Sequence, residues 1–196
     1  MVMIRKFFSD GIPSFFNNYD TGAPFTKCTF CDAALDAKSK YAIEKMINQN
    51  IALQSREIVY EYALCWNCAT TMGSQLSNDS KEAIQELYKE HSETVMRKLD
   101  YLHRTEKYSL ESWLERCSLT GKEIRLCSEF SVSGIVEGGN LVYEQSPIVV
   151  SDEFMHKLQQ VLSKETKEGF DALRDKILDS SPSIEDLVFG PVPGLM

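Results

Sequence analysis

The sequence of 196 residues has few histidines and none of the short motifs of common hydrolases or nucleotide-binding enzymes. Its three histidines, His91, His103 and His156, lie outside any HExxH pattern, and neither GxSxG nor a phosphate-binding glycine-rich loop is present. Catalysis needs reactive side chains in a defined mutual arrangement. The absence of any recognisable set of this kind favours a non-catalytic protein.

Long apolar runs and an excess of basic residues are also absent. No stretch approaches the roughly 18 apolar residues of a membrane-spanning helix, and Arg5 and Lys6 interrupt the N-terminus before a segment of signal-peptide length has formed. The net charge of -8 and pI near 5.0 disfavour binding to nucleic acid through the overall field. We therefore expect a cytoplasmic protein without membrane association, whose partner is another protein.

One local cluster points towards nucleic acid instead. Five basic residues and four phenylalanines of the N-terminal part can be placed on one surface: Arg5, Lys6, Lys27, Lys38 and Lys40, with Phe7, Phe8, Phe15 and Phe16. The simpler interpretation is that the phenylalanines anchor an N-terminal arm in the core and that the charges are solvated. Weak nucleic-acid binding through this surface is one alternative function.

Four of the six cysteines form two close pairs. Cys28 and Cys31 lie in KCTFC, Cys65 and Cys68 lie in LCWNC, and 33 residues separate the pairs. A two-residue gap lets both thiolates of a pair reach one ion at about 2.3 Å, and two pairs complete a closed tetrahedral site. In a reducing compartment this spacing predicts metal binding rather than disulfide bonds. We expect one structural zinc ion, bound by Cys28, Cys31, Cys65 and Cys68.

The segment between the pairs predicts a β-hairpin. Residue alternation indicates strands in SKYAIEKM (39–46) and REIVYEYAL (56–64). Residues 47–55 are polar enough to be the connection between these strands. The 33-residue spacer is longer than that of the usual double-CxxC zinc site, and a hairpin accounts for its length.

After the hairpin the apolar pattern becomes helical, with Cys68, Met72 and Leu76 at helical spacings. The second pair therefore opens a helix, whose N-terminus favours thiolates. A zinc knuckle, a hairpin and a helix in this order resemble treble-clef zinc fingers over residues 25–77. Treble-clef units also occur in HNH nucleases, but the second strand here has no histidine, and four cysteines leave no open position on the metal.

A strand leading into CxxC at the start of a helix also resembles thioredoxins. In that interpretation Cys65 and Cys68 are a thiol–disulfide redox pair, with Pro147 as the cis-proline beside them. The first cysteine pair is then unexplained, and alternating strands and helices are missing between Cys68 and Pro147. A redox protein is the second alternative function.

The second half of the chain repeats part of the first. LSNDSKEAIQEL (76–87) aligns without gaps with LSKETKEGFDAL (162–173), with five identities in twelve positions. CTFCDAAL from Cys28 aligns with CSLTGKEI from Cys117 at an offset three residues larger, which a shorter hairpin loop in the second copy reconciles. That hairpin is marked by three glycines: Gly134, Gly138 and Gly139.

This repeat predicts an α+β fold of tandem duplicated knuckle–hairpin–helix units, of which the second has lost its metal. At the four ligand positions the second unit has Cys117, Thr120, Ser151 and Phe154, and a lone thiol cannot hold zinc as a structural site does. Cys117 is then a vestige and Cys127 a core residue. A second site built from both cysteines and a histidine is the alternative.

The remaining segments complete the predicted plan. A helix from Ser80 to about residue 104 connects the units through an apolar stripe: Ile84, Leu87, His91, Val95, Leu99 and Leu102. Trp113 is expected to pack where the units meet. The predicted division is an N-terminal arm (1–24), a zinc-binding unit (25–110), a metal-free unit (111–180) and an extended tail (181–196) that docks on the body or on a partner. The predicted function is a non-catalytic zinc-binding module for protein interaction.

Overall fold

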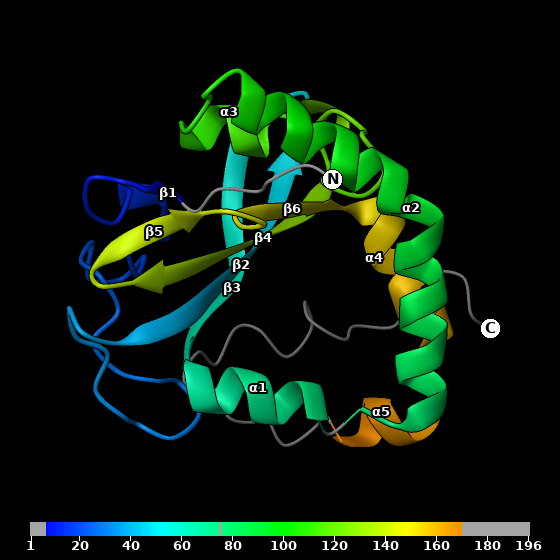
Figure 1. The fold of residues 1–196 in the computed structure, drawn as a ribbon, viewed down its shortest axis with the longest axis horizontal. Helices are drawn as coiled ribbons and strands as arrows, with labels where there is room; N and C mark the ends of the chain where they lie inside the picture. The colour runs from blue at the N-terminus through cyan, green and yellow to red at the C-terminus, as the bar shows by residue number, and fades with distance from the viewer. Residues whose placement is uncertain (1–6, 75, 170–196) are drawn as a thin grey trace.

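A computed structural model describes residues 7–74 and 76–169. The fold is α+β, with a six-stranded antiparallel sheet in the order β1-β5-β4-β2-β3 and with β6 also paired to β4 (Figure 1). The strands are β1 (Phe7–Phe8), β2 (Lys40–Asn50), β3 (Ser55–Cys65), β4 (Glu129–Glu137), β5 (Asn140–Tyr143) and β6 (Ile148–Ser151).

Within the described residues, five α-helices lie around this sheet: α1 (Trp66–Ser74), α2 (Asn78–Arg104), α3 (Leu110–Leu114), α4 (Asp152–Val161) and α5 (Lys164–Gly169). The predicted connecting helix is confirmed as α2, which begins two residues early because the Ser77 side chain accepts a hydrogen bond from the Ser80 N–H. Its stripe buries Leu87, Leu99 and Leu102. In the described ranges no helix combines the length and apolar character needed to cross a membrane.

The hairpin of β2 and β3 is longer than predicted, because its strands extend through most of the expected connection. Ile47 is buried and paired with Ile58, and residues 51–54 form the turn. Gln49 is buried despite its polarity, since its side-chain amide donates to the carbonyls of Ile124, Arg125 and Cys127. Because its amide is hydrogen-bonded, Gln49 can occupy a buried position on the strand, and β2 extends beyond the predicted end.

The centre of the sheet is the antiparallel pair of β2 and β4. Their register runs from Lys40 opposite Glu137 to Asn48 opposite Glu129, with Glu44 opposite Ser133 in the middle. β3 flanks β2 on one side, and β6 pairs with β4. Both halves of the chain thus share one sheet and one core, to which the same face contributes Tyr41, Ile43, Ile47, Phe130, Val132 and Val136. The division into units at residue 110 stays a prediction.

Three of the four phenylalanines anchor the N-terminal arm as the simpler interpretation predicted, namely Phe7, Phe15 and Phe16, whereas Phe8 is 51% exposed. Phe16 is fully buried, and the Phe7 ring stacks on Tyr108 with 4.0 Å between centroids. Beneath the arm, the buried Lys45 forms a 2.5 Å ion pair with Glu61 and also donates to the Asn17 carbonyl. Arg5 and Lys6, like the predicted tail (181–196), lie outside the described residues.

The glycines of the second hairpin have two different roles. Gly138 and Gly139 have φ angles of +64° and +76° and form the turn between β4 and β5, as predicted. Gly134 instead lies inside β4, where a Cβ atom would come within 2.7 Å of the Phe16 ring and 2.9 Å of Leu141. Its missing side chain makes room for the anchor of the N-terminal arm.

We therefore expect Gly134→Ala to lower the free energy of unfolding by about 1–3 kcal/mol, the usual cost of overpacking a core. Urea unfolding followed by circular dichroism measures the change. The control is Gly73→Ala in α1, where a Cβ atom meets nothing within 4 Å and the gain in helix propensity makes the change neutral or stabilising. Equal stability of the two variants would contradict this account of Phe16.

Candidate metal centre

The four cysteines of the two CxxC pairs come together at one point. The Sγ atoms of Cys28, Cys31, Cys65 and Cys68 all lie within 4.8 Å of one another. The Sγ atoms of Cys31 and Cys65 are 3.7 Å apart. Four sulfurs placed tetrahedrally around an ion at about 2.3 Å are about 3.8 Å from each other, whereas a disulfide joins sulfurs at about 2.05 Å. The cluster has the dimensions of a four-thiolate metal site.

A tight loop positions the first pair. The Cys28 N–H donates to the Ala33 carbonyl at 2.8 Å, and the Asp32 N–H donates to the Cys28 carbonyl at 2.9 Å. Asp32 has a φ angle of +59°, a left-handed conformation that aspartate tolerates better than most residues. The loop closes with a β-bridge between Lys27 and Ala34. This turn returns the chain so that both thiols of the pair face the same point.

The second pair is positioned where β3 meets α1. Cys65 is the last residue of β3, and Cys68 lies in the first turn of α1, where its N–H donates to the Cys65 Sγ at 3.5 Å. The loop of the first pair is tied to the same strand, since the Thr29 N–H donates to the Ala63 carbonyl at 2.8 Å. The hairpin between the pairs therefore brings the second pair back to the first.

The electrostatics of the cluster favour a bound cation. Burial alone raises the pKa of the Cys28 thiol, but backbone N–H groups of Cys65, Cys31 and Phe30 outweigh it and bring the pKa to about 7. Burial raises the pKa of Cys68, and the neighbouring thiols raise it further. Four thiolates at this spacing repel one another, and a divalent cation removes the repulsion. Cys28 and Cys68 are buried while Cys31 is exposed, so the site lies just below the surface.

A second loop has the same hydrogen bonds without the other thiols. The Cys117 N–H donates to the Lys122 carbonyl, the Gly121 N–H donates to the Cys117 carbonyl, and Arg116 and Glu123 form the β-bridge. These bonds match those of the Cys28 loop, with Gly121 (φ +73°) in the place of Asp32. The two cysteines occupy corresponding positions in two similar loops.

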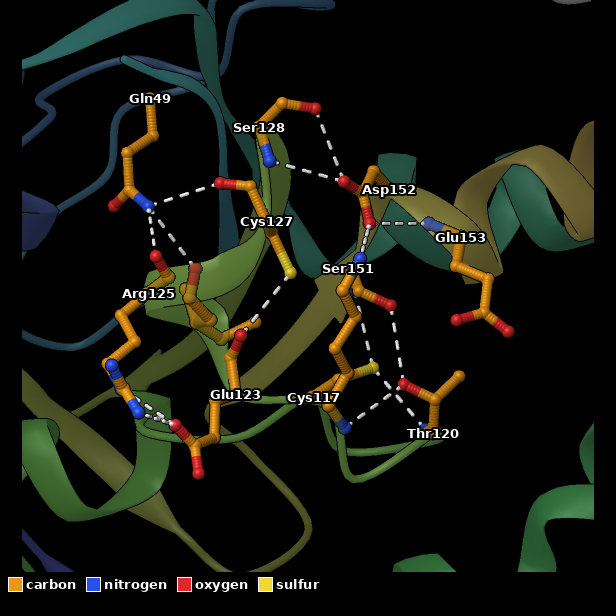
Figure 2. A network of polar contacts seen from close by, with 12 residues as sticks. Gln49, Cys117, Thr120, Glu123, Arg125, Cys127, Ser128, Ser151, Asp152 and Glu153 are labelled. Carbon is orange, nitrogen blue, oxygen red and sulfur yellow. Dashed lines mark hydrogen bonds and ion pairs between the residues drawn. The ribbon is translucent and has the colours of Figure 1, made fainter. Parts of the chain in front are cut away.

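Figure 2 shows the surroundings of Cys117. They match those of Cys28, whose thiol accepts hydrogen bonds from the backbone of Cys31 and Cys65. Its Sγ accepts hydrogen bonds from the N–H groups of Thr120 (3.4 Å) and Ser151 (3.3 Å), and the Oγ atoms of these two residues are 3.4 Å apart. Burial raises the pKa of the Cys117 thiol, and the hydrogen bonds from Ser151 and Thr120 more than offset it, leaving the pKa lowered. Phe154, fully buried, lies in the first turn of α4 as Cys68 lies in α1.

The alternative site built from Cys117, Cys127 and a histidine is not formed. Among the described residues, which include every cysteine and histidine, only the Cys28 cluster brings three or more metal-binding side chains together. Cys127 is fully buried, as predicted, and its S–H donates to the Glu123 carbonyl. The geometry therefore offers one four-cysteine metal site and two thiols, Cys117 and Cys127, outside it.

Two of the three histidines and Trp113 contact other groups of the fold. The His91 ring packs edge-to-face on Phe154, while His103 lies within hydrogen-bond distance of the Tyr108 hydroxyl and the Glu144 carbonyl. His156 is exposed on α4. Trp113 is fully buried and donates its indole N–H to the Lys107 carbonyl. None of these side chains joins the cysteine cluster.

The peptide bond before Pro147 is cis, as the redox interpretation predicted, but the position of Pro147 does not support that interpretation. This residue immediately precedes β6, which pairs with β4, whereas Cys65 ends β3, which pairs with β2. β4 and β2 thus lie between the two strands in the sheet. Cys65 and Cys68 instead share their site with the first cysteine pair.

Comparison of the chain with protein-family models, with curated protein sequences and with solved structures gave no match. The cysteine cluster, whose position and geometry follow from the fold, is the feature of the molecule that indicates a function.

Proposed function

We propose that the protein is a non-catalytic zinc protein, in which one ion bound by Cys28, Cys31, Cys65 and Cys68 stabilises the fold and the surface binds a protein partner. The observation that carries the proposal is the convergence of four Sγ atoms within 4.8 Å. A tetrahedral set of four thiolates suits zinc, and it leaves no position for a water or a substrate. The chemistry of the site is therefore structural.

The surface beside the cluster supports a protein partner. Trp66, which follows Cys65 directly, exposes 40% of its surface, and the Lys40 Nζ lies 3.9 Å from the centroid of its ring. An exposed tryptophan backed by a rigid site is a common anchor of protein interfaces. The net charge of -8 disfavours a nucleic-acid partner.

We further propose that the fold is a duplicated treble-clef-like unit whose second copy lost its metal. The corresponding loops at Cys28 and Cys117 support this proposal, and so does the register of the sheet. The offset that relates Cys28 to Cys117 relates Glu44 to Ser133, and these two residues lie opposite each other at the centre of the β2–β4 pair. Two copies related by a two-fold axis through this point would pair in this way.

The first test is the metal content of protein purified without added metal, measured by elemental analysis together with a count of free thiols. We expect about one zinc per chain and six reduced cysteines. Iron in place of zinc would keep the site but change the metal, since four thiolates also suit iron. A metal-free protein with one or two disulfides would overturn the proposal.

A further inference from the structure

A hollow of about 400 Å³ lies between the N-terminal arm and the β2–β3 hairpin. It shares no residue with the cysteine cluster. A concave site of this size, mostly apolar and with a few polar groups, is typical of small-molecule binding. The lining includes three apolar and three polar side chains: Phe15, Ile47, Ile58, Asn17, Lys45 and Arg56.

The most deeply buried cation of this lining is already neutralised. Lys45 is 2% exposed, and its Nζ lies 2.5 Å from the Glu61 Oε2. The Glu61 carboxylate also accepts hydrogen bonds from the Asn18 side-chain amide and from the Tyr19 N–H, both in the arm. The ion pair therefore holds the arm against the hairpin and contributes no net charge to the hollow.

Arg56 contributes the unbalanced positive charge. Its Nε donates to the Gln49 Oε1 at 2.8 Å, and its guanidinium carbon lies 5.5 Å from the centroid of the Phe130 ring. These contacts orient the guanidinium, and in the described part of the chain no carboxylate forms an ion pair with it. A planar guanidinium held in this way binds a carboxylate through two parallel hydrogen bonds.

An unpaired hydrogen-bond acceptor belongs to the same lining. The Asn17 Nδ2 donates to the Gly22 carbonyl at 2.9 Å, so the Oδ1 is the atom of this amide left to accept. This oxygen is buried and, among residues 7–74 and 76–169, it is the only buried side-chain polar atom without a partner. Buried polar atoms without partners are rare in folded proteins. The acceptor favours a ligand that carries a hydroxyl or N–H donor.

We propose that this hollow binds a small organic acid that has an aromatic or branched aliphatic body and a hydroxyl or amide group beside its carboxylate. The carboxylate pairs with Arg56, the body packs on the apolar lining, and the donor group bonds to the Asn17 Oδ1. Charge complementarity selects an anion, because the Lys45–Glu61 pair is neutral and the Arg56 charge is not balanced. This binding goes beyond the proposed function and does not depend on the metal.

Titration of the full chain with 3-phenyllactate, followed through backbone amide chemical shifts, tests the proposal. We expect saturable shifts in residues 14–22 and 45–58. The uncharged 3-phenyllactamide keeps the ring and the hydroxyl, and it should bind roughly tenfold or more weakly, because it loses the charge-assisted bonds to Arg56. The acid without the hydroxyl, 3-phenylpropionate, should bind several-fold more weakly.

The matched variants are Arg56→Gln and Arg104→Gln. Both lower the net charge by one, but the Arg104 side chain lies on α2 and is 75% exposed. We expect Arg56→Gln to weaken binding of 3-phenyllactate roughly tenfold or more, and Arg104→Gln to bind as the wild type does. Thermal unfolding of each variant shows whether its fold is intact.

The proposal would be overturned by the absence of saturable shifts, by shifts confined to other parts of the chain, or by equal binding of acid and amide. Wild-type affinity in a folded Arg56→Gln protein would overturn it as well. If this variant does not fold, the comparison of the three ligands on the wild type decides. Zinc content of the same samples is independent: one zinc per chain without binding rejects only the ligand site, and binding by a metal-free wild type rejects only the zinc proposal.

Discussion

Replacing Cys28 with serine will release the metal ion and unfold the first half of the protein, whereas replacing Cys117 with serine will leave the ion bound. The two cysteines sit in loops with the same backbone hydrogen bonds, and both thiols are fully buried. They differ in that only Cys28 shares its site with three further thiols. The pair of variants therefore isolates metal binding from the general cost of replacing a buried cysteine.

The expected difference between these variants is large. A structural four-cysteine site contributes an apparent binding free energy on the order of 10 kcal/mol, which is comparable to the whole stability of a domain of this size. Loss of the hydrogen bonds to the Cys117 thiol costs only about 1 kcal/mol. Elemental analysis and thermal unfolding measure both effects. Retention of one zinc by Cys28→Ser, or its loss in Cys117→Ser, would reject the assignment of the ligands.

The second prediction is the gain of a metal site. The triple variant Thr120→Cys, Ser151→Cys and Phe154→Cys places thiols at the three positions around Cys117 that correspond to Cys31, Cys65 and Cys68. The Oγ atoms of Thr120 and Ser151 are already 3.4 Å apart, close to the 3.7 Å between the Sγ atoms of Cys31 and Cys65. We expect about two zinc ions per chain in place of one.

The stability of this variant will depend on metal. Removal of the buried Phe154 ring costs about 3–5 kcal/mol, judged from Phe-to-Ala changes in cores, and a second four-thiolate ion more than offsets this cost. The control carries Thr120→Ser and Phe154→Ser with Ser151 unchanged, which removes the same ring but adds no thiol. If the triple variant binds no more metal than the control, the second loop does not have the ligand geometry of the first, and the duplication proposal loses its main support.

The metal cluster could be predicted because its information is local. Two CxxC pairs, a strand before the second pair and a helix after it can each be recognised within a few residues. The start of α2 is equally local, since Ser77 caps the helix through one side-chain bond. Such local patterns can be recognised without any knowledge of the rest of the fold.

The extent of the hairpin and the centre of the sheet depend on distant partners instead. From the sequence alone, Gln49 is typical of a loop, because the carbonyls that accept its hydrogen bonds, those of Ile124 and Cys127, belong to a distant segment of the chain. The pairing of Glu44 with Ser133 likewise joins strands that are far apart in the chain. Neither has a pattern in its own sequence, because β pairing and buried hydrogen bonds are set by the neighbour.

A metal ion bound at the cysteine cluster would favour one register of the β2–β3 hairpin. In β2 and β3 Tyr41 lies opposite Cys65, and the pairing shifts once, between Met46 and Ile47. A slip by two residues would keep every side chain on its original face, so the apolar pattern discriminates weakly against it. The same slip would displace Cys65 by about 6.6 Å, at about 3.3 Å per residue, which is too far for a thiolate that must lie about 2.3 Å from the ion. A metal ion bound by Cys65, at the end of β3, and by the cysteine loop that precedes β2 would therefore favour this alignment of the two strands over its nearest competitors.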